Sequence, residues 1–220
     1  MKTIYEKFKK EDIPNLPRAV FEGRIFVITT ESETKKAIDY LMKQPILGFD
    51  TETRPSFKHG VVHKVSLLQV STHDTCFLFR IKDTGITDSI KQLLEDTHIT
   101  KIGLSLHDDF MMLQKRRKFV PGTFIDLQNE VKELGIADCS LQKLYANIFG
   151  RLISKRQQLT NWDADILTEP QKLYAATDAW ACIMLHEEIE RLNKTNDYEL
   201  ILDVPDIPEI VEEQESQDNK

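Results

Sequence analysis

Short apolar runs of strand length, first clustered and then alternating with helical segments, are the feature that most restricts the fold of this chain. The runs with strand-like composition cover residues 24–30, 46–53, 64–72, 75–81 and 99–105. Apolar residues at helical spacing cover residues 31–44, 87–96, 107–118 and parts of 127–149. Clustered strands followed by alternating strands and helices predict an α/β chain with one mixed sheet flanked by helices.

Two local signals refine this prediction. Thr72-His73-Asp74 separates two of the strand-like runs and is typical of a hairpin connection. Pro170 begins a long amphipathic segment that we expect to be helical to about Asn193. A proline suits the first turn of a helix because its missing N–H would have no partner there.

The net charge of −7 comes from the end of the chain. Residues 196–220 hold nine of the 36 acidic residues and one of the 29 basic residues, so the remainder is nearly neutral. We therefore predict one folded domain over residues 1–195 and an acidic, disordered tail over 196–220. A purely solubilising tail is the favoured interpretation, and a docking peptide for a protein partner, formed by apolar Ile207, Ile210 and Val211, is the alternative.

Cysteine usage and the absence of a long apolar run predict a cytoplasmic protein. Cys76, Cys139 and Cys182 are far apart and form no CxxC pair, which favours a reducing compartment. Residues 1–20 are charged and polar, unlike a secretory signal peptide. No apolar run approaches the ~18–20 residues that a membrane span needs, so no membrane association is expected.

Two pairs of acidic residues stand where strands end or helices begin. Asp50 and Glu52 close the run 46–53, and residues i and i+2 of a strand point to the same face. Asp108 and Asp109 lie between a predicted strand and a predicted helix. There we expect one of them to cap the helix and the other to remain available for chemistry. Taken singly, each pair fits a solvated strand end or a helix cap equally well.

A third polar pair lies in the long C-terminal helix. Tyr174 and Asp178 are four residues apart, so the hydroxyl and the carboxylate share one face of the helix. Small residues such as Ala175 and Ala179 stand beside them and allow a close approach to a neighbouring element. A buried tyrosine with an incidental hydrogen bond is the alternative interpretation of this pair.

Together these motifs resemble the DEDD 3′–5′ exonucleases of the tyrosine subclass, in the branch of ribonuclease D and the Werner-helicase exonuclease domain. The first, second and third motifs of that family are similar to GFDTET (48–53), KIGLSLHDDFMML (101–113) and LYAATDA (173–179). The same branch is matched by SLLQ (66–69) and NWDADILTEPQKLYAATDAWA (161–181). The resemblance extends from about Arg24 to Leu192, most of the chain.

The resemblance implies an RNase H-like mixed sheet flanked by helices, together with a metal-dependent active site. It assigns metal binding to Asp50, Glu52, Asp109 and Asp178, and it makes these four and Tyr174 the catalytic residues. An ordinary phenol has a pKa of about 10, so we expect Tyr174 to orient the attacking water rather than to act as a full base.

The chain departs from the family pattern around its second motif. Ser105 stands where the family often has asparagine, and adjacent Asp108 offers an alternative to Asp109. Asp109 is favoured because Gly103 then falls six residues ahead of it, as in the relatives. Leu173 occupies the position of the histidine that defines the histidine subclass, which is thereby excluded.

The implied reaction is hydrolysis of phosphodiester bonds from the 3′ end of DNA or RNA, with release of nucleoside 5′-monophosphates. Two Mg²⁺ or Mn²⁺ ions suit a cluster of carboxylates, because both prefer oxygen ligands and a pair of ions stabilises the attacking and departing oxygens. The alternatives are a catalytically silent nucleic-acid-binding module on the same fold and an exonuclease subunit active only in a complex. The choice between DNA and RNA stays open at this stage.

Residues expected to contact nucleic acid lie in three places: around the first motif, in the basic run 115–118 and in the loop before Trp162. They are Thr51, Thr53, Arg54, Phe57, Lys115, Arg116 and Lys155. The alternatives are a solvated helix end for the basic run and an ordinary loop anchor for Phe57. Trp162 and Trp180 are expected in the core.

Overall fold

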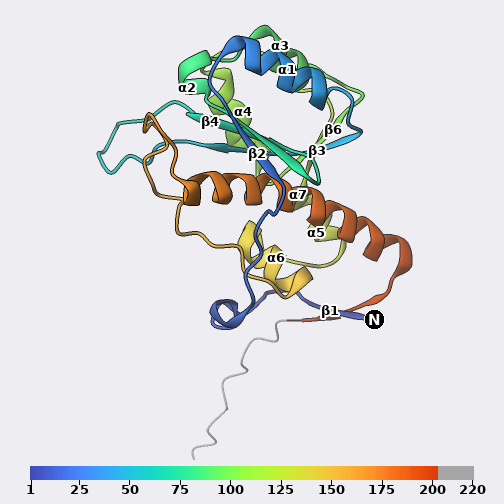
Figure 1. Ribbon diagram of the computed structural model, residues 1–220. Helices are drawn as coiled ribbons and strands as arrows, with labels where there is room; N and C mark the ends of the chain where they lie inside the picture. The colour runs from blue at the N-terminus through green and yellow to red at the C-terminus, as the bar shows by residue number, and fades with distance from the viewer. Residues whose placement is uncertain (203–220) are drawn as a thin grey trace, which may run out of the picture.

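The computed structural model describes residues 1–202. Within them, a six-stranded sheet with the order β2-β5-β4-β3-β6-β7 forms the centre of the fold (Figure 1). Its strands are β2 (Arg24–Ile28), β3 (Ile46–Glu52), β4 (Leu67–Ser71), β5 (Thr75–Phe79), β6 (Thr100–Gly103) and β7 (Phe124–Asp126). The β3–β4 and β4–β5 pairs are antiparallel, and the β2–β5, β3–β6 and β6–β7 pairs are parallel. The predicted α/β class and the mixed sheet are confirmed.

Helices cover both faces of this sheet (Figure 1). One face carries α1 (Glu31–Leu41), α2 (Ile81–Thr84), α3 (Asp88–Glu95) and α4 (Leu106–Gln114). The other face carries α5 (Leu127–Glu133), α6 (Leu141–Phe149) and the long α7 (Glu169–Thr195). Each layer has its own apolar core, and buried Trp162 belongs to a third cluster between the sheet and the first part of α7. Trp162 is thus in the core as expected, whereas Trp180 is partly buried and packs against the two clusters beside α7.

The packing of α7 against β3 requires small residues on both sides. A Cβ atom added to Gly48 would lie 1.8 Å from the backbone oxygen of Ala179, far inside van der Waals contact. Ala175, Ala176 and Ala179 are fully buried, and their small side chains leave room for the helix to pack closely on its neighbours. The absence of a side chain at residue 48 therefore lets α7 approach the strand that carries the first acidic motif.

The start of α7 follows from its capping residues. The Thr168 side chain accepts a hydrogen bond from the backbone N–H of Gln171, and the Gln171 side chain accepts one from the backbone N–H of Thr168. Pro170 lies in the first turn, as predicted from the sequence. At the other end, Asn196 adopts a left-handed conformation with φ 49° and ends the helix.

A small second sheet corrects the predicted domain boundary. In a parallel pair, β1 (Lys2–Tyr5) lies beside β8 (Tyr198–Ile201), where the sequence led us to expect a disordered tail from residue 196. Ile4 is fully buried and Leu200 packs on the same cluster, while acidic Glu199 is exposed. Glu199 thus faces solvent from a strand, and the folded part extends past residue 195. The predicted docking peptide lies outside the described residues.

Some other elements differ from expectation. The helix predicted over 107–118 ends at Gln114, and the three-residue strand β7 and the short helix α2 had no clear signal in the sequence. The hairpin connection at Thr72 is confirmed, with a 2.8 Å hydrogen bond from its backbone N–H to the backbone oxygen of Thr75.

None of the helices in residues 1–202 combines the length with the apolar character that a transmembrane segment needs.

Candidate active site

The structure brings three acidic side chains together where α7 crosses β3. Asp50 and Glu52 lie on the same face of β3, two residues apart, and Asp178 comes from the buried face of α7. One oxygen from each of the three carboxylates lies within 4.8 Å of the others. Glu52 and Asp178 are buried, with 9% and 7% of their surface exposed. Residues far apart in the sequence therefore form one compact group of oxygen atoms.

Burial and mutual repulsion make this group costly to ionise without a cation. Burial, then Asp109 and Asp178, raise the pKa of Asp50 well above its usual value. The same effects, burial first, raise the pKa of Glu52 to about 10. Burial raises the pKa of Asp178 to about 7. The Asp178 Oδ1 atom is buried and has no hydrogen-bond partner among the described residues. These are the properties of a site that needs positive charge.

Asp109 lies beside this group, in the first turn of α4. Its carboxylate accepts a hydrogen bond from the Thr51 hydroxyl, and burial raises its pKa to about 6. Neighbouring Asp108 is exposed, and its Oδ1 atom lies 3.1 Å from Nδ1 of His107. Of the two acids in the second motif, Asp109 is thus the one placed against β3.

Neither Asp108 nor Asp109 caps α4, contrary to the expectation from the sequence. The backbone N–H groups of Ser105 and Leu106 instead donate to the Asp126 carboxylate, over 3.0 and 2.9 Å. Asp126 ends β7 and also caps α5 through the backbone N–H of Gln128. No local sequence pattern predicts this contact, because Asp126 lies 21 residues after Ser105 and 20 residues after Leu106. It leaves Asp109 free of a capping role.

Tyr174 lies one helical turn before Asp178, and its hydroxyl is hydrogen-bonded to the Asp178 carboxylate. Burial and the surrounding carboxylates raise the pKa of Tyr174 well above its usual value. Its ring packs against Trp162, whose Nε1–H donates to the backbone oxygen of Gln158 over 3.3 Å. The tyrosine therefore remains a protonated donor in a fixed position.

Asp109 lines a small hollow, whereas Asp50, Glu52, Tyr174 and Asp178 line a cavity of about 270 Å³. Its walls include Lys155 and Gln158 from the loop before α7, Ser140 and Gln142 at the start of α6, and Leu104 after β6. Lys155 acts on the Asp178 carboxyl in the direction that lowers its pKa. Apart from Lys155, these wall residues were not predicted from the sequence, because no motif or periodicity distinguishes them.

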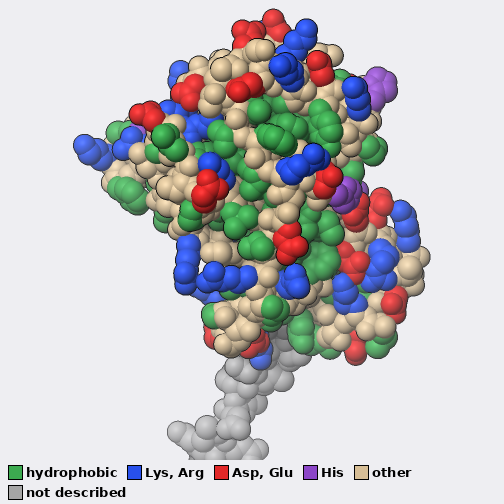
Figure 2. Space-filling view, viewed as in Figure 1, with side chains coloured by type: hydrophobic (Ala, Val, Ile, Leu, Met, Phe, Trp, Pro, Cys, Tyr) green, Lys and Arg blue, Asp and Glu red, His purple; other side chains and the backbone are tan. Residues whose placement is uncertain are grey.

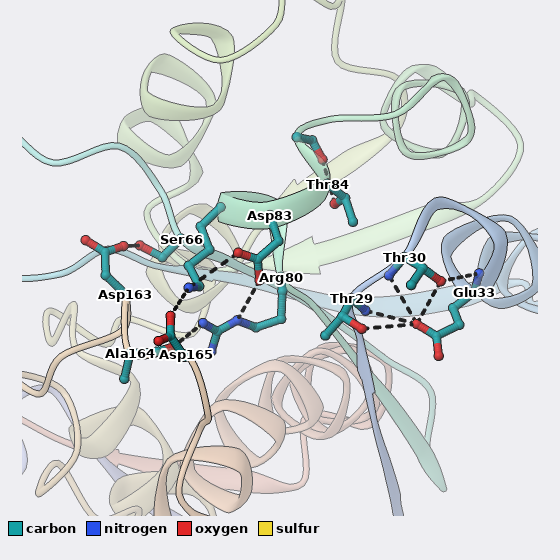
Figure 3. Close-up of polar contacts among 12 residues, drawn as sticks. Thr29, Thr30, Glu33, Ser66, Arg80, Asp83, Thr84, Asp163, Ala164 and Asp165 are labelled. Carbon is teal, nitrogen blue, oxygen red and sulfur yellow. Dashed lines mark hydrogen bonds and ion pairs between the residues drawn. The ribbon is translucent and has the colours of Figure 1, made fainter.

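Polar contacts hold the loop that carries Lys155 and Trp162 against the sheet. The Ser66 hydroxyl donates to Asp163, the fully buried Arg80 donates to the backbone oxygen of Ala164, and Lys82 pairs with Asp165 at 3.3 Å (Figure 3). Three successive residues of the loop are thus attached to β4, β5 and α2 or their ends. This attachment fixes the cavity wall on the side of α7.

Among the other residues predicted to contact nucleic acid, Thr51 lines the main cavity, and Thr53 lines a small hollow beside it with Asp109. Phe57 is 84% exposed, and Arg54 is exposed on the same segment after β3. The two residues predicted from the basic run 115–118 differ in their surroundings. Lys115 is exposed, but the Arg116 Nε–H donates to the backbone oxygen of Val65 over 2.5 Å, so this side chain holds the fold together.

Comparison with known proteins identifies the family. The model of the 3′–5′ exonuclease domain family matches residues 25–193. The bifunctional 3′–5′ exonuclease/ATP-dependent helicase WRN of Mus musculus is 29% identical over 204 residues, which are 88% of this chain and 14% of the mouse protein. This chain therefore spans a small part of that relative.

Solved structures show the same fold. The Nibbler EXO domain of Aedes aegypti superposes with a TM-score of 0.72 at 19% identity, over 81% of this chain and 92% of that one. Ribonuclease D of Trypanosoma brucei, solved in complex with RNA U12, superposes with a TM-score of 0.66 at 20% identity, over 77% of this chain and 63% of that one. With the family model covering most of its length, this chain belongs to the 3′–5′ exonuclease family of DEDD type.

Proposed function

We propose that this protein hydrolyses the last phosphodiester bond at the 3′ end of a DNA or RNA strand, using two divalent ions, and releases nucleoside 5′-monophosphates. One observation carries the proposal. Asp50, Glu52 and Asp178 place one oxygen each within 4.8 Å of the others in a cavity that Tyr174 also lines.

The residues present fit divalent metal ions. The donor atoms are all carboxylate oxygens, which hard ions such as Mg²⁺ and Mn²⁺ prefer. The unpartnered Oδ1 atom of Asp178 supplies a free ligand position, and a bound cation would offset the burial and mutual repulsion that raise the pKa values of the cluster. Asp50, Glu52, Asp109 and Asp178 are the proposed ligands. Bound ions would activate the attacking water and stabilise negative charge on the departing 3′ oxygen.

The side chains around the carboxylates have separate proposed tasks. Tyr174 stays protonated, so its hydroxyl orients the attacking water by a hydrogen bond and does not remove its proton. Lys155 lines the same cavity and offers a positive charge to the phosphate. Thr51 holds the Asp109 carboxylate in place through its hydroxyl. In the reaction, the water oxygen forms a bond to phosphorus while the bond from phosphorus to the 3′ oxygen breaks. The attacking water gives up a proton to solvent, and the departing 3′ oxygen takes one up to become the new 3′-hydroxyl.

The nature of the strand is a question for experiment. The Trypanosoma brucei relative was solved in complex with RNA U12. Side-by-side digestion of single-stranded RNA, single-stranded DNA and a recessed-3′ duplex, each with Mg²⁺ or Mn²⁺, tests the proposal. Loss of single nucleotides from the 3′ end of at least one substrate is expected. Absence of nucleotide release from all three, with either ion, would contradict it.

A further inference from the structure

A second cavity, of about 330 Å³, adjoins the proposed active site. Tyr174 and Ile153 line both cavities, but none of the carboxylates of the first lines the second. The loop before α7 forms the partition between them. Lys155 faces the first cavity, and Arg156 faces the second.

The far wall of the second cavity is the segment around Arg18, which is fastened to the rest of the fold. The backbone N–H of Ala19 donates to the backbone oxygen of Leu152 over 2.9 Å, and Phe21 N–H donates to the Thr177 hydroxyl over 3.1 Å. Arg18 itself pairs with Leu152 in an isolated parallel bridge. Both walls are therefore held in position before any ligand arrives.

The lining combines positive charge with apolar surface. Arg18 and Arg156 are its only charged residues, and neither guanidinium forms an ion pair or a side-chain hydrogen bond within residues 1–202. Val20 and Leu173 add apolar surface and are 41% and 37% exposed. Figure 2 shows Lys and Arg side chains gathered below the start of α7, on the left of that face. Guanidinium groups beside apolar surface suit a nucleotide, whose phosphate is anionic and whose base is flat and apolar on its faces.

We propose that this second cavity binds the strand on the 5′ side of the scissile bond, with Arg18 and Arg156 on its phosphates and Val20 and Leu173 against a base or sugar. The inference rests on the proposed function. The 3′-terminal nucleotide occupies the first cavity, so the rest of the strand leaves across a neighbouring surface. The other hollow that adjoins the carboxylates shares only Thr51 with the first cavity.

That hollow is lined by two aspartates, Asp108 and Asp109, and by no cation. Asp109 is a proposed metal ligand, but the exposed Asp108 carboxylate repels a phosphate there, whereas the guanidinium groups of the second cavity attract one. Charge and continuity through Tyr174 thus both favour the second cavity as the path of the strand.

The test compares binding of a 5′-fluorescein hexanucleotide, in EDTA to prevent hydrolysis, by wild type and by the double variant Arg18→Ala/Arg156→Ala. Fluorescence anisotropy at several salt concentrations gives the slope of log K against log salt. Loss of two phosphate contacts on a single strand flattens that slope by about 1.4. Arg18→Gln/Arg156→Gln retains much of the side-chain length and should flatten it equally, which separates lost charge from lost packing.

A matched control is Arg24→Ala/Lys36→Ala, which removes the same charge from a groove formed by β2, β5 and α1. It should leave the slope close to that of wild type. An unchanged slope in the Arg18/Arg156 variants, or an equal flattening in the control, would overturn the proposal. Digestion of the same hexanucleotide by wild type with Mn²⁺ tests the proposed function separately. If no nucleotide is released, that function fails while the binding comparison still decides the role of the cavity.

Discussion

The ring of Trp162 lies against the ring of Tyr174, with the two centroids 6.0 Å apart and the planes at 36°. Trp162 is fully buried, and its indole N–H is bonded to the backbone oxygen of Gln158. The indole thus links the cavity loop to the tyrosine, and its position determines where the Tyr174 hydroxyl points.

Replacing Trp162 should therefore lower both stability and turnover. Trp162→Ala should cost about 3–5 kcal/mol of unfolding free energy, because a large buried ring is lost. Trp162→Phe should remain folded and lower kcat, with little change in metal affinity. Trp180→Phe is the matched control, since Trp180 packs instead on Phe21 and Tyr145. Equal kcat values for the two phenylalanine variants would contradict a positioning role.

Tyr174→Phe removes only the hydroxyl that bonds Asp178. We expect kcat to fall by about 10²-fold or more, because the attacking water loses the donor that orients it. Divalent-ion binding, measured by calorimetry, should change little, since the carboxylates remain. Wild-type kcat in this variant would remove Tyr174 from the mechanism.

The apoprotein should lose stability as the pH rises. The pKa values of Asp109, Asp178 and Glu52 are raised by burial to about 6, about 7 and about 10. Groups with raised pKa values bind protons more tightly in the folded state. Their contribution to the free energy of unfolding is complete below a pH of about 4, which is the pKa of such carboxyl groups in the unfolded chain. It is lost as the pH rises through the pKa values of the folded state.

Melting temperatures measured in EDTA should therefore fall between pH 5 and pH 8, and Mg²⁺ or Mn²⁺ should stabilise the protein more at pH 8. The melting temperature of Asp178→Asn should fall less steeply with pH, because this variant lacks one of the titrating groups. The pKa of His186 is also raised, by its hydrogen bond to Glu130, and this too lowers stability as the pH rises. Comparison of wild type with Asp178→Asn separates the effect of the carboxylate from that of the histidine. A melting temperature in EDTA that rises over this range would contradict the pKa assignment.

Gln69 offers a test of stability. Its side chain is fully buried, and neither its amide nitrogen nor its amide oxygen has a hydrogen-bond partner among residues 1–202. Replacement by leucine removes two unsatisfied polar atoms and keeps most of the volume. We expect Gln69→Leu to raise the unfolding free energy by about 1 kcal/mol or more in urea denaturation. A less stable protein would show that the amide has a partner, such as a buried water.

The elements that the sequence predicted well are those with a local pattern. The strands around Asp50 and the long helix from Pro170 have apolar periodicity and caps that act over a few residues. Elements that depend on distant partners were missed. The β1–β8 pair joins Lys2 to Tyr198 and has only Ile4 as a deeply buried anchor, so its acidic strand looked like a tail.

The candidate site divides in the same way. Asp50, Glu52, Tyr174 and Asp178 could be proposed because the motifs that hold them resemble those of the family, whereas their spacing on one strand or one helix left other interpretations open. The wall residue Gln142 was missed because its role depends on how α6 packs beside α7. The structural part played by Arg116 was missed for a similar reason, since its partner is a backbone oxygen far away in sequence.

The most direct test of the central claim is digestion of a 5′-labelled single strand by wild type and by Asp178→Asn, with Mg²⁺ or Mn²⁺. The account predicts a ladder that shortens by one nucleotide at a time from the 3′ end, with nucleoside 5′-monophosphate as the product. Asp178→Asn should be slower by roughly 10³-fold or more, because the buried carboxylate that joins the cluster from α7 is lost. Equal rates for the two proteins would contradict the assignment of this carboxylate cluster as the active site.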